Sequence, residues 1–249
     1  MHTATSHQFQ LSLYQNYGPL SVRTGDRRIF APISYPVVRQ AQIVPIVHIE
    51  AFAMASWFPI CWQIKEQQPC LVVLRSLWTD ASCQPPGSPE NSASLPLALS
   101  AYPFVVGVTD QMNDQDKCLL EEAIPDQPSD VGAPILTPTG KAGRGSKQRL
   151  KAVAAFNGAL ALTQAMTGLL FKCELFEPWP LKFEIANQTL VVKDLFIVRQ
   201  SEFNSSALFR FVNEFGPTGV SFLGAHRISL FRAGSLFQAA QPATSSGFK

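Results

Sequence analysis

Charged residues are scarce in this sequence. Asp, Glu, Lys and Arg make up 15% of the 249 residues, against about 25% in a typical soluble domain. The net charge is only +2, and no stripe of Lys and Arg interleaved with aromatic residues is present, so nothing indicates a nucleic-acid-binding protein. Hydrophobic residues make up 46%, which excludes a chain disordered throughout and predicts a large core, an adhesive surface or both.

Sequence motifs of catalysis and metal binding are also missing. There is no G-x-S-x-G nucleophile elbow, dinucleotide fingerprint, phosphate-binding loop or calcium-binding loop. The cysteines form no C-x-x-C pair and no Cys/His cluster with zinc-finger spacing, which favours reduced, buried thiols in a reducing compartment. One disulfide or one reactive thiol remains as an alternative. The five cysteines are Cys61, Cys70, Cys83, Cys118 and Cys173.

No basic region followed by an apolar run and a cleavage site opens the sequence, so we expect no Sec signal peptide and a cytoplasmic protein. Residues 152–171 are uncharged and about long enough to span a bilayer. However, polar side chains recur through this segment, from Asn157 to Thr167, and much of the rest is Ala and Gly. We therefore expect a buried helix and no transmembrane segment; a membrane anchor would instead make the protein insoluble without detergent.

Short β-branched and aromatic runs, punctuated by proline and glycine, predict strands joined by turns over residues 28–80. Residues 57–65 and 69–78 resemble a hairpin, and residues 181–198 predict a second hairpin with its turn at 186–188. Residues 100–110 predict one more buried strand. Two stretches read as exposed loops: the Pro/Ser-rich segment 81–95 and the acidic segment 110–130.

A helical period over 146–171 predicts one long helix with Ser146 as its N-cap. A shorter helix is expected from about residue 205 until Gly216-Pro217 ends it. The fold class is therefore α+β, a mainly antiparallel sheet with one long helix and short C-terminal helices. We expect a single domain over 17–238, an N-terminal extension over 1–16 and a disordered tail over 239–249.

Three residues are candidates for a catalytic or metal site. His48 and Glu50 are two residues apart and would share one face of a strand, and His226 is a candidate third ligand. A His/Glu/His set suits zinc, iron or general acid–base chemistry. The alternative, which we favour, is structural: Glu50 pairs with an arginine such as Arg227 or Arg75, and His226 bonds to backbone. No cofactor is indicated.

Four segments together resemble the SapC family, bacterial proteins named for association with a surface layer. The first is IVPIVHIEAFAMASWFPICW, residues 43–62. The second is AYPFVVG, residues 101–107, with Tyr102, Pro103 and Phe104 at its centre. The others are ELFEPWPL, residues 174–181, with Glu177, Pro178 and Trp179, and the closing segment from Gly219 to Leu236, which contains His226.

The resemblance implies a divergent SapC-like protein with no established catalytic residues to carry over. It implies a non-enzymatic role in surface-layer assembly, or an accessory role, through contacts with a protein partner. It also implies an alternative location at the cell surface, reached by a route other than Sec. The competing hypothesis is a cytoplasmic enzyme that depends on a metal or small ligand and uses His48, Glu50 and His226.

Overall fold

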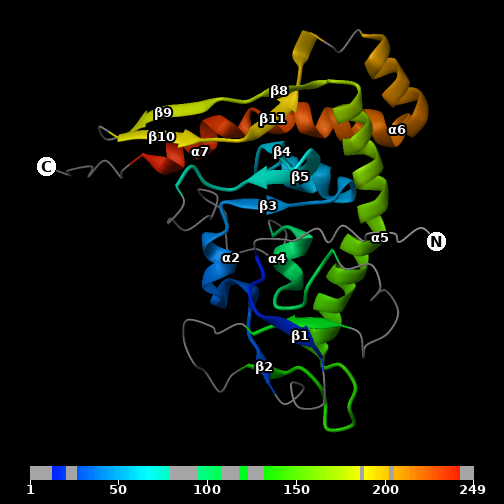
Figure 1. Ribbon diagram of the computed structural model, residues 1–249. Helices are drawn as coiled ribbons and strands as arrows, with labels where there is room; N and C mark the ends of the chain where they lie inside the picture. Colours follow the sequence, from blue (N-terminus) through cyan, green and yellow to red (C-terminus); the bar gives the residue numbers. More distant parts are fainter. Residues whose placement is uncertain are drawn as a thin grey trace, which may run out of the picture. The chain divides into compact units, whose positions relative to one another are not determined.

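The computed structural model describes residues 13–20, 27–78, 95–107, 118–122, 132–185, 188–201 and 205–241 (Figure 1). The chain divides into two compact units, and each consists of two separate stretches. Unit 1 comprises residues 1–39 and 97–160, and unit 2 comprises residues 40–96 and 161–249. Most of the predicted loops at 81–95 and 110–130 lie outside the described residues, and the single domain expected over 17–238 stays a prediction.

Unit 1 is built from short elements around the first part of a long helix. Its two small antiparallel ladders join β1 to β6 and β2 to β7. The elements are β1 (Tyr17–Pro19), β2 (Arg28–Ile29), the 3₁₀ helix η1 (Pro32–Ser34), α2 (Pro36–Gln40, whose last residue belongs to unit 2), α4 (Leu97–Ala101), β6 (Leu119–Glu121), β7 (Ala133–Pro134) and the start of α5 (Arg144–Lys172).

Unit 2 contains a five-stranded antiparallel sheet in the order β3-β5-β4-β11-β8, and a separate hairpin of β9 and β10. The α+β prediction is confirmed. The elements of this unit, besides the end of α5, are β3 (Ile43–Pro45), the 3₁₀ helix η2 (His48–Glu50), α3 (Ala51–Ala55), β4 (Ile60–Lys65), β5 (Gln68–Leu74), β8 (Phe176–Pro178), β9 (Leu181–Ile185), β10 (Gln188–Val192), β11 (Leu195–Val198), α6 (Ser206–Ser229) and α7 (Arg232–Ala240).

Both predicted hairpins are present, and the first has a two-residue turn. Glu66 and Gln67 connect β4 to β5 with φ of 48° and 63°, the left-handed pair that matches the twist of antiparallel strands. The second hairpin joins β9 to β10, and β11 follows it. Residues 186–187 of its predicted turn lie outside the described ranges.

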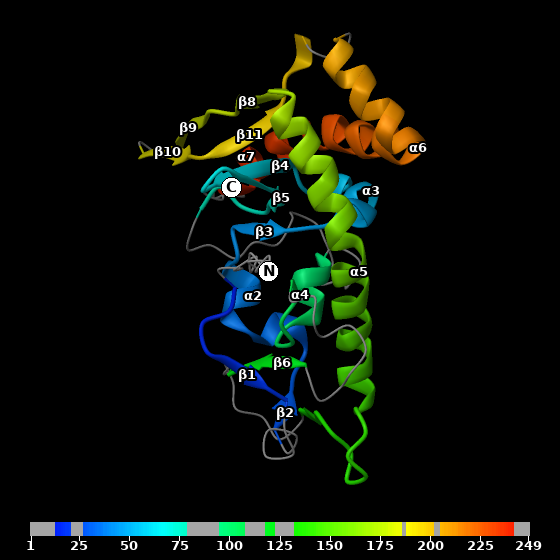
Figure 2. The same ribbon diagram turned by 45° about the vertical axis from the view of Figure 1, so that its right-hand side comes forward.

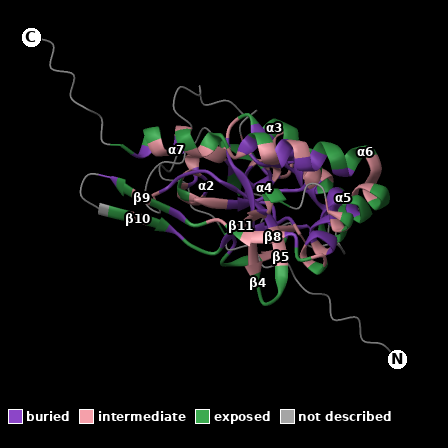
Figure 3. Cartoon of the chain, turned by 90° about the horizontal axis from the view of Figure 1, so that it is seen from above, coloured by how far each residue is buried: buried purple, intermediate pink, exposed green. Residues whose placement is uncertain are grey.

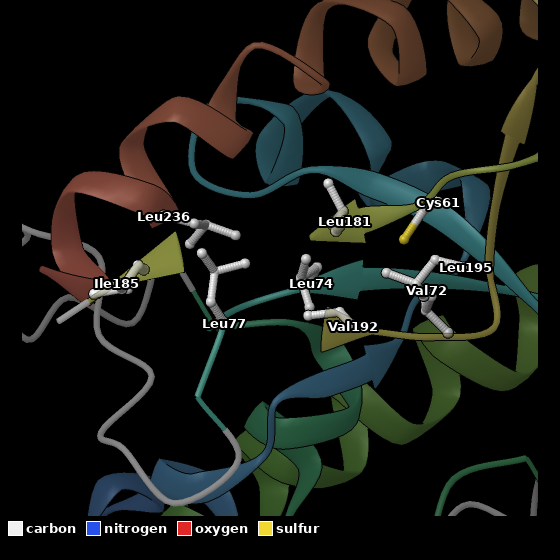
Figure 4. Packing of buried hydrophobic residues seen from close by; sticks show 10 residues of the cluster. Cys61, Val72, Leu74, Leu77, Leu181, Ile185, Val192, Leu195 and Leu236 are labelled. Atoms are coloured by element: carbon white, nitrogen blue, oxygen red, sulfur yellow. The ribbon is translucent and has the colours of Figure 1, made fainter. Parts of the chain in front are cut away.

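The hydrophobic core of unit 2 lies between the sheet, the β9–β10 hairpin and α7 (Figure 4). Phe183 of β9 packs against Phe237 of α7 with ring centroids 5.3 Å apart. Because strand residues alternate between faces, the hairpin turns one row of apolar side chains toward this core. The cluster consists of Cys61, Val72, Leu74, Leu77, Leu181, Ile185, Val192, Leu195, Leu236 and Ala240.

Four short segments that the pattern predicts as strands are helical or irregular. Residues 32–34, 36–40 and 48–55 form helices, and Pro36 begins α2 because its fixed φ suits the first turn of a helix. Residues 101–107 form no named strand; Phe104 makes one isolated bridge to Leu120. A short apolar run has no period long enough to separate a strand from a buried helical turn.

The long helix α5 begins at Arg144, so Ser146 is not its N-cap. Ser146 instead donates a hydrogen bond to the Ile135 carbonyl, 2.7 Å away. Asn157, Thr163 and Thr167 are buried, whereas Gln164 is exposed. Asn157 Oδ1 accepts from Gly107 N at 2.7 Å, and Thr167 donates to the Thr163 carbonyl at 3.0 Å. By length and hydropathy α5 is the one described helix able to cross a membrane, yet more than half of its most apolar window is buried.

Helix α6 does not end at Gly216-Pro217 but bends there and continues to Ser229. Gly216 has φ 54° and ψ −141°, a conformation that essentially only glycine adopts. Pro217 follows, where its missing N–H costs little because the bend starts a new first turn. Ser205 caps the first arm by accepting a hydrogen bond from Leu208 N. The predicted short C-terminal helices are therefore the two arms of α6 and α7.

A test of this bend compares two glycines of α6. We expect Gly216→Ala to lower the free energy of unfolding by about 1–3 kcal/mol, because a Cβ disfavours this backbone conformation. Gly224→Ala is the matched control: its Cβ would meet nothing within 4 Å, and alanine favours the helix by up to about 1 kcal/mol. Urea unfolding of both variants measures the difference. Equal effects at the two positions would contradict the assigned bend.

Candidate functional site

His226 bridges two strands of the sheet in unit 2. Its Nδ1–H donates to the Ile60 carbonyl of β4 at 2.8 Å, and its Nε2 accepts from Val198 N of β11 at 3.2 Å. The ladder between these strands pairs Leu195 with Gln63 and Phe196 with Trp62. Continued by two residues, that register would pair Val198 with Ile60, so the imidazole stands between two residues that would otherwise face each other across the ladder.

Ser229 completes this bridge from the same side of α6. Its hydroxyl accepts from Ile60 N at 2.8 Å and donates to the His226 carbonyl at 2.6 Å. Residues three apart on a helix lie on one face, so His226 and Ser229 satisfy both backbone groups of Ile60. The sequence alone did not single out Ser229. Its position three residues after His226, which places both on one face of a helix, was the signal that could have found it.

The bridge requires a neutral imidazole. His226 is fully buried, and burial lowers its pKa from 6.5 to about 4; the nearby Arg227 acts in the same direction, and the bond to Ile60 opposes both. A proton on Nε2 would also set one donor against another, since Val198 N–H has to donate there. The ring packs edge-on to Trp62 with centroids 4.7 Å apart. His226 therefore acts as a structural crosslink near neutral pH.

His48 and Glu50 lie in the 3₁₀ helix η2, not on the strand that the pattern predicts. Thr163 Oγ1 of α5 lies 3.0 Å from His48 N and 2.8 Å from its Nδ1. The buried carboxylate of Glu50 accepts from Val47 N at 3.0 Å. Because side chains two apart on such a turn point in different directions, the shared face expected of a strand is absent.

The three candidates are thus held by three different sets of partners. In the part of the chain that the structure describes, no group of three or more His, Cys, Asp or Glu side chains is arranged to hold a metal ion. The four described cysteines, Cys61, Cys70, Cys118 and Cys173, are free thiols. Burial raises the pKa of Cys70 to about 12 and that of Cys61 further, so neither thiol is primed as a nucleophile.

Tyr102, Pro103 and Phe104 belong to the core of unit 1. The rings of Tyr102 and Tyr14 stack with their centroids 5.9 Å apart. The Tyr14 hydroxyl donates a hydrogen bond to the Phe104 carbonyl, 3.1 Å away. Tyr14 thus packs in this core although it falls within the predicted extension 1–16. Burial raises the pKa of both tyrosines, so neither ionises near neutral pH.

A buried arginine of α5 organises the carbonyl groups of unit 1. Arg149 Nε donates to the Tyr102 carbonyl at 2.8 Å, Nη1 donates to Gly145 at 3.2 Å, and Nη2 donates to Phe30. Burial lowers the pKa of this guanidinium. Because the Tyr102 and Phe30 carbonyls belong to two other segments and the Gly145 carbonyl to α5 itself, Arg149 holds those two segments to the start of the helix.

One acidic residue of the predicted solvated loop is buried in unit 1. Glu121 lies in β6, and its two carboxylate oxygens accept from Gln15 N and Asn16 N, each at 2.9 Å. The prediction of an exposed loop is wrong at this position, because backbone donors from the N-terminal segment replace solvent around the carboxylate.

Glu177, Pro178 and Trp179 lie at the outer strand of the five-stranded sheet. Glu177 and Pro178 belong to β8 and pair with Ile197 and Phe196 of β11. Trp179 N donates to the Leu195 carbonyl at 2.7 Å, and its half-buried ring packs against the core cluster. These residues hold an edge of the sheet and form no cluster of ionisable groups.

Comparison with known protein families identifies the family of this chain. The SapC family model matches residues 22–207, which is more than half of the chain. The chain belongs to the SapC family. No curated protein and no solved structure matches it. The matched range includes the segments at 43–62, 101–107 and 174–181, whereas the segment Gly219–Leu236 lies beyond it, so its family resemblance stays a prediction.

The buried imidazole makes the stability of this SapC protein depend on pH. The unfolded chain binds the proton of His226 near pH 6.5 and the folded chain near pH 4. The free energy of unfolding should therefore fall as the pH drops through this window, by about 3 kcal/mol from this residue alone, and stay unaffected by it above the window. Urea unfolding at a series of pH values measures this slope.

Two variants separate titration from packing. His226→Phe should lower the free energy of unfolding at neutral pH by about 2–4 kcal/mol, because two buried backbone groups lose their partners, and should flatten the slope between pH 6.5 and 4. Ser229→Ala, the control, removes a neighbouring bond but titrates nothing, so the wild-type slope should persist. An unchanged slope in His226→Phe would contradict a neutral buried imidazole.

Proposed function

We propose that this SapC-family protein is non-enzymatic and acts in surface-layer assembly, or in an accessory role to it, through contacts with a protein partner. The observation that carries the proposal is the use of both His226 nitrogens by backbone groups. An imidazole with no free nitrogen, sealed from solvent, can neither bind a metal nor exchange protons with a substrate.

Exposed apolar side chains support the binding role. Phe209 is 64% exposed on the first arm of α6, and Phe231 is 87% exposed at its end. Single exposed apolar residues are ordinary, but large aromatics this open are typical of interaction surfaces. The alternative of a metal- or ligand-dependent enzyme has less support, since His48 and Glu50 are also engaged within the fold.

We further propose a cytoplasmic location, with export to the cell surface by a route other than Sec as the alternative. The free thiols among the described cysteines suit a reducing compartment. An accessory protein that prepares or escorts a surface-layer component before its export would act on the cytoplasmic side.

Complementation in the native host tests the non-enzymatic role. In cells lacking this protein, the wild type and the variants His48→Ala and Glu50→Gln should restore the surface layer equally, as judged by electron microscopy of the cell envelope. Glutamine retains an oxygen that accepts from Val47 N, and His48→Ala should cost only about 1 kcal/mol of stability. Failure of either variant, with thermal unfolding near that of the wild type, would refute the proposal.

Protease treatment of intact cells tests the location. A cytoplasmic protein should survive as fully as a cytosolic control and should be digested only after lysis. Immunodetection of this chain before and after lysis gives the answer. Digestion on intact cells, with the control spared, would replace the cytoplasmic location by the exported one.

A further inference from the structure

Two elements of unit 2 that are in contact, α3 and α6, and the residues next to them carry large exposed apolar side chains. Val220 and Ile228 lie on the second arm of α6, 52% and 62% exposed, and Phe231 follows directly after the helix. Helix α3 packs on α6 (Figure 2) and adds Phe52, 61% exposed, with Ile49 just before it in η2. We call these five residues the apolar face; exposed parts of α3 and α6 are visible in Figure 3.

In the segments that carry this face, the charged side chains that reach solvent are positive. Residues 48–57 and 217–241 contain three charged side chains, Glu50, Arg227 and Arg232. Glu50 is buried, whereas Arg232 is exposed and Arg227 is half-buried. A second copy of the chain docked face to face would bring these arginines together, and within the two described segments the one carboxylate, Glu50, is buried, which disfavours self-association. A negatively charged partner suits the face.

The shape of the face indicates what kind of partner this is. Phe231 is 87% exposed, so the described chain covers little of its ring and the ring is free to insert into an apolar medium. Projecting Phe and Ile side chains beside arginine are typical of segments that lie in the interface of a bilayer. The guanidinium of Arg232 can pair with lipid phosphates, and an anionic leaflet attracts each basic residue near its surface.

We propose that the apolar face docks unit 2 on an anionic lipid bilayer, with Phe231 and Ile228 entering the acyl boundary and Arg232 contacting the phosphates. This docking is peripheral and differs from a membrane-spanning role of α5. It also goes beyond the contact with a protein partner and does not depend on it.

Vesicle sedimentation of the full-length protein tests the proposal. The chain should sediment with vesicles of equal parts phosphatidylglycerol and phosphatidylcholine and stay in solution with phosphatidylcholine alone. Binding should weaken at high salt, because screening reduces attraction at an exposed surface. Phe231→Ser should lower the partition coefficient about tenfold. Phe209→Ser is the matched control, since it removes an exposed phenylalanine from the other arm of α6, and should bind as the wild type does.

A second pair of variants tests the charge. Arg232→Gln should weaken binding to the anionic vesicles several-fold, whereas Arg210→Gln, an exposed arginine on the first arm of α6, should not. Circular dichroism and thermal unfolding should be the same for all four variants.

Four results would overturn the proposal. Equal sedimentation with and without phosphatidylglycerol would remove the role of charge, and binding that resists high salt would indicate insertion of α5. No sedimentation at all would leave an acidic protein as the occupant. Self-association in light scattering that Phe231→Ser abolishes would assign the face to a second copy of the chain.

Discussion

The sheet of unit 2 depends on a neutral imidazole that joins two strands where their own ladder stops. Strands β4 and β11 pair directly at Trp62 and Phe196. Further along, His226 hydrogen-bonds to Ile60 of β4 and to Val198 of β11. Each such bond contributes only about 1 kcal/mol, but a buried backbone group without a partner costs more than the bond supplies. Trp62 packs against the buried imidazole, and Phe176 and Phe222 pack in turn against Trp62. The second arm of α6 is thereby part of the sheet's hydrogen bonding as well as its cover.

Much of the architecture could be predicted from the sequence because long patterns carry it. The helical period of α5 and the two hairpins extend over enough residues to separate a period of 3.6 from alternation. The errors fall on short segments, such as residues 48–55, where a few apolar residues fit a strand and a helical turn equally. The pair Gly216-Pro217 predicts the end of a helix, although glycine at positive φ followed by proline can also start a second helical arm.

For the candidate site, too, the sequence predicts some features and not others. A structural role of His226 was predictable from its setting among large apolar residues, but its partners were not, since Ile60 lies 166 residues away. The burial of Glu121 was equally hidden, because the donors that satisfy it belong to residues 15 and 16. Local pattern identifies which residues are unusual, and only the tertiary structure identifies what they bond to. Among the described residues, His226, Glu50, Glu121 and Arg149 all bond to backbone groups.

The connectivity of unit 2 has a consequence for synthesis of the protein. The imidazole and the hydroxyl that satisfy the backbone of Ile60 are synthesised 166 and 169 residues after it. Until residues 226 and 229 emerge, β11 can already pair with Trp62 and Gln63, but the two backbone groups of Ile60 lack these partners. The hydrogen bonding of Ile60 is therefore completed only after α6 has been synthesised, and a chain truncated before α6 keeps these two backbone groups without their partners.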